Sequence, residues 1–430
     1  MRFNKETFIT GFALFSLFFG AGNLILPPHL GLEAGNTWPW VTVGFVISAV
    51  VLPLLGIFAH ARLQGTMLDF GKKVSFGFSL IYCSIVYIIS IALPSPRTAS
   101  VTYEMAIAPF YEVHTLITSS VYFILVLIFA LNRSKILSVL GKFLTPIIFL
   151  VILSIILIGI FSIHPPMNES LYKTPVINGL LEGYQTFDAI GSVVVGGVVI
   201  ISLQLKGKKS FEETRNLIRK AGIIAGTGLF IVYAGLIMNG ALFNADFEQG
   251  ITRTNLLSGL SIKTLGSIGT IFLSVLVSLA CFTTAVGIVT GTADFVKGVC
   301  HQSSKAYTIT AIIGCILGIG MGQLDVNDII VVAVPALMFI YPITIVLIFL
   351  NVLPEKYTSS FVFRAVVIMT IVFSLPDFLA SIGMKEFVTP ILNALPLGTH
   401  SLAWLLPAFL TLWLLNIFIW LKKKATIFNI

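Results

Sequence analysis

Gly20, Ala21, Gly22 and Asn23 interrupt a long apolar run near the N-terminus of the chain, and Pro27 follows a few residues later. Glycine leaves the helical conformation at little steric cost. A helix interrupted here exposes carbonyl oxygens to a cation and N–H groups to an anion such as a carboxylate. The Asn23 amide oxygen adds a further ligand for a cation. The alternative is a small-residue packing face that ends at Pro27.

A second interruption lies at Thr186, Phe187, Asp188 and Gly191. Asp188 is the one acid that we place inside an apolar span. A carboxylate at the centre of a membrane helix is costly, so we expect Asp188 to face a cavity or a partner. The alternative is that Asp188 lies near the outer end of its helix, where water reaches it.

A third polar patch comprises Ala280, Cys281, Thr283 and Thr284. Threonine hydroxyls in membrane helices commonly bond to the backbone of their own helix. Neighbouring threonines can also supply the hard oxygen ligands that a small cation prefers. Both interpretations are open from the residues alone.

The composition identifies the environment in which these groups lie. Of the 430 residues, 57% are hydrophobic and only 10% are charged, whereas soluble domains carry roughly 25% charged residues. A chain this apolar cannot cover a globule of its size with polar surface, so soluble enzymes and nucleic-acid-binding proteins are excluded. The four cysteines and six histidines are dispersed and have no metal-ligand spacing.

Apolar runs long enough to span a bilayer, about 20 residues each, predict an all-α polytopic membrane protein with twelve transmembrane helices. The predicted spans are 7–30, 38–61, 74–96, 115–131, 136–163, 184–205, 221–243, 265–293, 306–323, 328–350, 362–382 and 402–421.

The basic residues predict that both termini are cytoplasmic. With the N-terminus inside, only five of the 26 lysines and arginines fall on the outer side, and the positive-inside rule favours this orientation. The five are Arg97, Lys173, Arg253, Lys263 and Lys385.

The interruptions in the first and sixth spans lie five spans apart. Because five is odd, a repeat of the first five spans would be inverted across the membrane. We therefore predict a five-plus-five inverted repeat with broken helices 1 and 6. Residues 1–163 would form the first repeat, 164–350 the second, and 351–430 two accessory helices.

Other classes of membrane protein fit less well. A membrane enzyme needs clustered catalytic side chains, and the histidines are spread along the chain. A channel would show repeated filter residues, and an ATP-driven pump a phosphate-binding loop; we find neither.

The motifs together resemble the bacterial branched-chain amino acid:cation symporter family of the BrnQ type, within the amino acid–polyamine–organocation superfamily. The resemblance implies uptake of leucine, isoleucine and valine across the bacterial cytoplasmic membrane, driven by a cation that is usually sodium. It implies no other cofactor. The segments that carry it are 20–23 with Pro27, Pro28 and Gly31, 96–99 with Glu104 and Pro109, 186–191, and 280–287.

The resemblance also assigns residues to sodium. One site would use carbonyls of Ser16 and Phe19 with Ala280, Thr283 and Thr284. A second site would use Asn23 and Thr186.

The substrate would bind at the two interruptions. Its carboxylate would meet the N–H groups of Gly20, Ala21 and Gly22 beside Asn23. Its ammonium would meet carbonyls of the sixth span near Gly191 and Asp188, and Phe187, with Tyr87 or Ile88, would line an apolar pocket.

Several assignments stay open at this point. Asp188 could instead contact the cation or take a proton, and coupling to protons or transport of another small neutral amino acid is the alternative function. Arg97 and Glu104 fit the family motif without an assigned role. Arg97 could simply extend to the outer surface.

Overall fold

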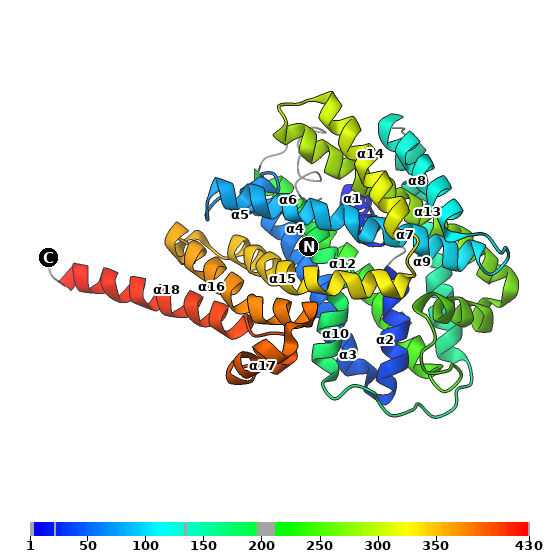
Figure 1. Cartoon of the computed structure of the whole chain (residues 1–430). Coiled ribbons are helices and arrows are strands. Elements are labelled where there is room, and N and C mark those ends of the chain that lie inside the picture. Colours follow the sequence, from blue (N-terminus) through cyan, green and yellow to red (C-terminus); the bar gives the residue numbers. More distant parts are fainter. Residues whose placement is uncertain (1–3, 21–22, 133–135, 195, 197–210, 429–430) are drawn as a thin grey trace. The chain divides into compact units, whose positions relative to one another are not determined.

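The protein is helical throughout the part of the chain that the computed structural model describes, which is residues 4–20, 23–132, 136–194, 196 and 211–428 (Figure 1). No β-strand occurs in these ranges, and the predicted all-α class is confirmed. The helices are α1 (Lys5–Phe18), α2 (Leu26–Ala34), α3 (Trp38–Val46), α4 (Leu52–Leu63), α5 (Leu68–Gly71), α6 (Phe76–Ala92), α7 (Pro94–Thr102), α8 (Thr115–Asn132), α9 (Ile136–Phe161), α10 (Pro175–Tyr184), α12 (Phe211–Leu242), α13 (Arg253–Val299), α14 (Ser304–Met321), α15 (Val326–Val352), α16 (Ser360–Leu379), α17 (Lys385–Ala394) and α18 (Leu405–Phe428).

Ten helical stretches within the described ranges are long and apolar enough to cross a bilayer. They match ten of the twelve predicted spans. The two other predicted spans, 7–30 and 184–205, are the ones expected to be broken. The second of them runs into 195 and 197–205, which lie outside the described residues.

The first break follows α1. The Gly20 N–H donates to the Phe18 carbonyl at 2.8 Å, and the Asn23 N–H donates to the Gly20 carbonyl at 3.0 Å, so the chain turns instead of continuing the helix. The helix resumes at Leu26 with prolines in its first turn, where a missing N–H costs no hydrogen bond. The predicted break is confirmed, although Ala21 and Gly22 lie outside the described residues.

The second break follows α10. The Phe187 N–H donates to the Tyr184 carbonyl at 3.1 Å, the φ angle of Phe187 is +59°, and helix resumes over 188–194. The predicted start of this span at 184 is wrong, because α10 begins at Pro175. Glu182 and the glycines of α10 lower its mean hydropathy, so its sequence resembles that of a loop.

Close backbone contacts hold α2, which follows the first break, and α10, which precedes the second break. A Cβ on Gly44 of α3 would lie 1.8 Å from the Val176 carbonyl oxygen of α10, and one on Gly179 of α10 would lie 2.0 Å from that of Val41. Gly31 of α2 approaches the backbone of α12 in the same way. Such contacts exclude any side chain larger than hydrogen and are typical of membrane helix packing. They hold α2, α3 and α10 side by side (Figure 1).

Helix α13 differs from its prediction at both ends. The predicted span 265–293 is part of a helical stretch from Arg253 to Val299, bent at Gly266, whose φ is 72°. Residues 253–265 resemble a loop in sequence because Arg253 and Lys263 interrupt their apolar pattern. Glycine is suited to this positive φ, because it has no Cβ to clash.

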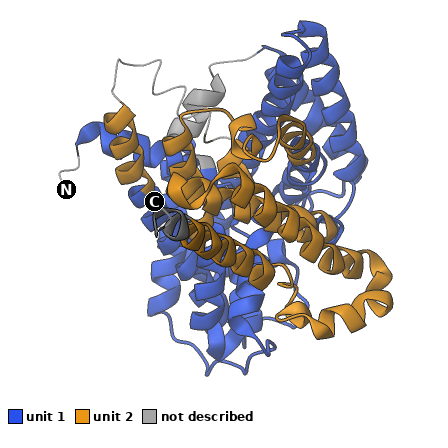
Figure 2. Cartoon of the chain, turned by 90° about the vertical axis from the view of Figure 1, so that its left-hand side faces the viewer, with its two compact units in different colours: residues 1–50, 87–187, 223–333 blue, residues 51–86, 188–222, 334–430 orange. Residues whose placement is uncertain are grey.

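Two compact units divide the chain (Figure 2). Unit 1 comprises 1–50, 87–187 and 223–333, and unit 2 comprises 51–86, 188–222 and 334–430. The units are defined by contacts and not by internal symmetry, so the predicted division into two repeats and two accessory helices stays a prediction.

Candidate functional site

Asn23 ties the first break to two helices of unit 1. Its side chain is buried, and its Nδ2 donates to the Phe18 carbonyl at 3.0 Å and to the Tyr233 hydroxyl of α12 at 3.3 Å. The Gly20 N–H, predicted to meet a carboxylate, donates to the same Phe18 carbonyl. The end of α1 is therefore held by groups from the break itself.

The threonine pair of α13 lies beside this break. A Cβ built on Gly20 would lie 3.9 Å from Thr284 Oγ1, so the structure brings together these two predicted site residues. The Thr283 and Thr284 hydroxyls each donate to the Ala280 carbonyl at 2.9 Å. This is the backbone bonding expected of membrane threonines. It uses the hydroxyl protons and leaves oxygen lone pairs.

Ser16 and Thr186 are engaged elsewhere in unit 1. The Ser16 Oγ lies 2.7 Å from Thr145 Oγ1 on α9. The Thr186 Oγ1 donates to the Gly183 carbonyl at 2.8 Å and so satisfies the end of α10. Thr186 and Asn23 are the predicted second sodium pair, and both are buried.

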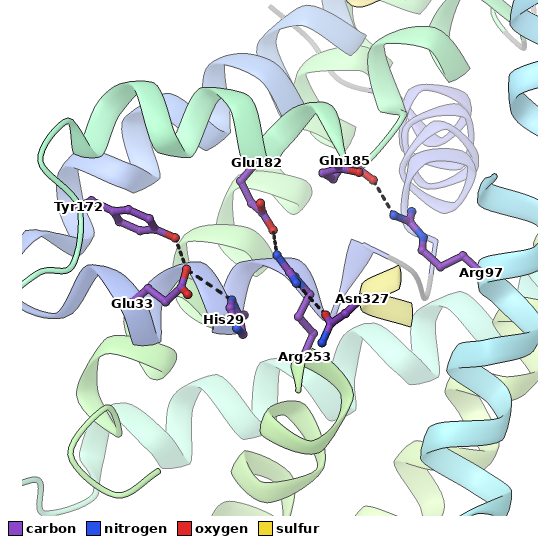
Figure 3. Close-up of polar contacts among 8 residues, drawn as sticks. All are labelled: His29, Glu33, Arg97, Tyr172, Glu182, Gln185, Arg253 and Asn327. Carbon is purple, nitrogen blue, oxygen red and sulfur yellow. Dashed lines mark hydrogen bonds and ion pairs between the residues drawn. The ribbon is translucent and has the colours of Figure 1, made fainter. Parts of the chain in front are cut away.

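Arg97 of α7 is the clearest new member of the site. Its Nη1 donates to the Gln185 carbonyl at 2.8 Å (Figure 3). Its Cζ lies 5.5 Å from the centroid of the Phe187 ring. Only 4% of Arg97 is exposed, so the interpretation that it extends to the outer surface is wrong. Its guanidinium instead holds the turn that follows α10.

Asp188 and Gly191 belong to unit 2. Asp188 is buried, with 6% of its surface exposed, and begins the helix of residues 188–194, where the helix dipole favours a carboxylate. A Cβ on Gly191 would meet nothing within 4 Å. The expectation that Asp188 is the one acid inside an apolar span is wrong. Asp377 of α16 is also buried and accepts from the Ala403 N–H at 3.2 Å.

A polar network in unit 1 links α10 to the starts of α13 and α15. Arg253 Nη2 lies 3.0 Å from Glu182 Oε1, and Arg253 Nη1 donates to Asn327 Oδ1 at 2.8 Å (Figure 3). Glu104 accepts from the Thr254 hydroxyl and, at 2.8 Å, from the Val326 N–H. Glu104 therefore caps α15, which gives this motif residue a structural role.

Glu33 of α2 connects to the segment that precedes α10. It accepts a hydrogen bond from the Tyr172 hydroxyl, and His29 Nδ1 lies 3.6 Å from its carboxylate (Figure 3). Burial, followed by the Glu33 charge, raises the pKa of Tyr172 above its ordinary value, so the phenol stays a donor. Sequence reasoning missed both networks, because their members are single polar residues far apart in the chain.

Known proteins resemble this chain over nearly its whole length. The sequence model of the family described as branched-chain amino acid transport protein matches residues 3–422. The branched-chain amino acid permease BraB of Bacillus subtilis is 35% identical over 419 residues, covering 94% of this chain and 93% of the permease. The branched-chain amino acid transport system 2 carrier protein of Pseudomonas aeruginosa is 32% identical over 413 residues, covering 94% and 93%.

Solved structures show the same fold at low sequence identity. Mhp1, a nucleobase-cation-symport-1 family transporter, superposes with a TM-score of 0.59 at 13% identity, covering 97% of this chain and 93% of Mhp1. A Na⁺-coupled sialic acid symporter gives 0.58 at 12% identity, covering 96% and 90%. From the family match and these relatives, the chain belongs to the branched-chain amino acid transport protein family and is a multi-pass membrane transporter, not an enzyme.

Proposed function

We propose that the chain is a sodium-coupled secondary transporter that imports leucine, isoleucine and valine across the bacterial cytoplasmic membrane by alternating access. The relatives named above supply the substrate class. The observation that carries the coupling is the approach of the first break to the α13 hydroxyls, measured between Gly20 and Thr284. Carbonyls freed by a broken helix, together with hydroxyls, are hard oxygen ligands suited to sodium.

The residues that would hold sodium are Thr283 and Thr284, through their hydroxyl oxygens, and the backbone at Ser16 and Phe19. The Ala280 carbonyl already accepts both hydroxyls, so its contribution is to orient them. This set contains no carboxylate and would bind a monovalent cation weakly enough to release it. A second sodium would bind the Asn23 amide oxygen and the Thr186 hydroxyl oxygen, because the bonds described above use the Nδ2 and hydroxyl protons and leave the oxygen lone pairs.

The substrate would bind along the two breaks. The N-terminal end of α2 favours the carboxylate through its helix dipole. The turn after α10 would receive the ammonium, and the buried Phe187 ring would contact the aliphatic side chain. Coupling follows when sodium and substrate bind the same outward-facing state, because each then raises the affinity of the other.

Proton coupling is the second candidate, and the burial of Asp188 favours it. A carboxylic acid inside a membrane transporter can carry a proton. The experiment that separates the two is uptake of radiolabelled leucine into proteoliposomes under an imposed sodium gradient or an imposed proton gradient. Accumulation under the sodium gradient alone supports the proposal. Accumulation under the proton gradient alone assigns coupling to protons.

A further inference from the structure

Gln185 carries a buried side-chain oxygen at the sixth-span break. Only 4% of Gln185 is exposed, and its Oε1 has no hydrogen-bond partner within the described part of the chain. Its backbone is fully engaged, since the N–H donates to the Glu182 carbonyl at 3.0 Å and the carbonyl accepts from Arg97. A buried amide oxygen without a donor costs free energy and calls for an explanation. A bound ligand that donates a hydrogen bond to this oxygen would be such an explanation.

Arg97 holds the backbone of the residue that carries this oxygen. The guanidinium contacts the residue on each side of Thr186, by a hydrogen bond to the Gln185 carbonyl and by its position over the Phe187 ring. A positive φ at a bulky residue such as Phe187 is strained and persists only when neighbours hold it. Helix α7, which carries Arg97, packs on α13. The turn is therefore anchored to the helix that carries the threonine pair.

We propose that Gln185 Oε1 accepts a hydrogen bond from the α-ammonium group of the transported amino acid, and that Arg97 is the residue that positions it. An ammonium group offers three donors and no acceptor, which complements a lone acceptor. The acceptor would thus select amino acids over carboxylic acids that lack the ammonium group. This inference rests on the proposed transport of branched-chain amino acids.

The test compares ligands that differ only in the charged groups. Unlabelled leucine and 4-methylpentanoate, which lacks the ammonium group, compete with radiolabelled leucine for uptake into proteoliposomes. In Gln185→Met the inhibition constant of leucine should rise roughly tenfold or more, the worth of a hydrogen bond to a charged group. That of 4-methylpentanoate should not change. General damage to the site would weaken both ligands alike, which would overturn the proposal.

Further variants separate positioning from binding. Gln185→Glu keeps an acceptor and should keep the preference for leucine over 4-methylpentanoate. Arg97→Gln should lower this preference, and adding Gln185→Met should lower it no further, because the two residues act as one unit. Should Gln185→Met not reach the membrane folded, Gln185→Ala and Arg97→Gln carry the same prediction.

Two controls match the chemistry elsewhere in the fold. Arg364 donates its Nε to the Val74 carbonyl at 2.8 Å, and Asn239 Oδ1 is another buried oxygen without a partner in the described ranges. Arg364→Gln and Asn239→Leu should leave the ligand preference unchanged, and a shift as large as that of Gln185→Met in either would contradict the proposal. Absence of leucine uptake by the wild-type protein would instead refute the proposed function.

Discussion

Gly20 lies beside Thr284, so that a Cβ on the glycine would be 3.9 Å from the threonine hydroxyl oxygen. The two residues are 264 positions apart in the chain. Gly20 lies in the break after α1 and Thr284 lies on α13, both within unit 1. Their approach places a broken helix next to a pair of hydroxyl oxygens. The proposed sodium site depends on this juxtaposition, and the first two predictions test it.

Thr283→Ala combined with Thr284→Ala should raise the sodium concentration that half-activates leucine uptake several-fold. The substitution removes two hard oxygen ligands, while leucine affinity at saturating sodium should change less. Thr292→Ala is the matched control, because Thr292 lies on the same helix and its hydroxyl also bonds to the backbone, at 2.9 Å from the Ile288 carbonyl. Unchanged sodium activation in the double variant would show that the two threonines serve helix packing and do not bind sodium.

Gly20→Ala and Gly31→Ala should separate function from folding. At Gly20 a methyl group makes only ordinary contact with Thr284, so the protein should fold, yet sodium activation should weaken as the space beside the hydroxyl fills. At Gly31 the methyl would lie 1.9 Å from the Ile237 carbonyl oxygen, and the clash should cost at least about 1–3 kcal/mol. Thermal unfolding in detergent, together with sodium titrations of uptake, measures both effects. Normal sodium activation in a folded Gly20→Ala variant would contradict the proposed site.

Asp188→Asn should reduce transport far more than it reduces the amount of folded protein. A buried intramembrane acid is costly and is retained where it serves function. Asp377→Asn is the control, because Asp377 is also a buried acid but caps the N–H of Ala403. Asp377→Asn should lower the stability of the protein and leave uptake per folded molecule unchanged. Wild-type uptake kinetics and pH dependence in Asp188→Asn would show that its charge has no part in transport.

Both termini should be cytoplasmic, as the basic residues predict. A cysteine in place of Glu248, an exposed residue of a predicted outer loop, should react with an impermeant thiol reagent in intact cells. Cys300 is exposed, whereas the three other cysteines are buried. It lies in a predicted cytoplasmic loop and should react only after permeabilisation. The reverse labelling pattern would show that the orientation in the membrane is opposite to the predicted one.

The two breaks were predictable because their signal is local. Gly20 and Pro27 are visible within one apolar run, and the same holds for Asp188 beside Gly191. The start of α10 was missed because Gly179 and Glu182 make it look like a loop, and only packing of its glycines on α3 explains it as a buried helix.

Contacts between distant residues could not be predicted in the same way. Nothing in one sequence states that Arg97 donates to the Gln185 carbonyl, or that Arg253 pairs with Glu182. Each residue alone resembles a solvated charge at a helix end. Their burial depends on which helices pack together, and that depends on the whole chain.

Reciprocal flux of sodium tests the central claim most directly. If leucine and sodium share one transport cycle, an inward leucine gradient must drive sodium inward, because coupling acts in both directions. Proteoliposomes with equal sodium on both sides should accumulate radioactive sodium when leucine is added outside, and the Thr283→Ala and Thr284→Ala double variant should accumulate less. Leucine entry that leaves sodium at equilibrium, or that acidifies the lumen instead, would contradict sodium-coupled transport by this protein.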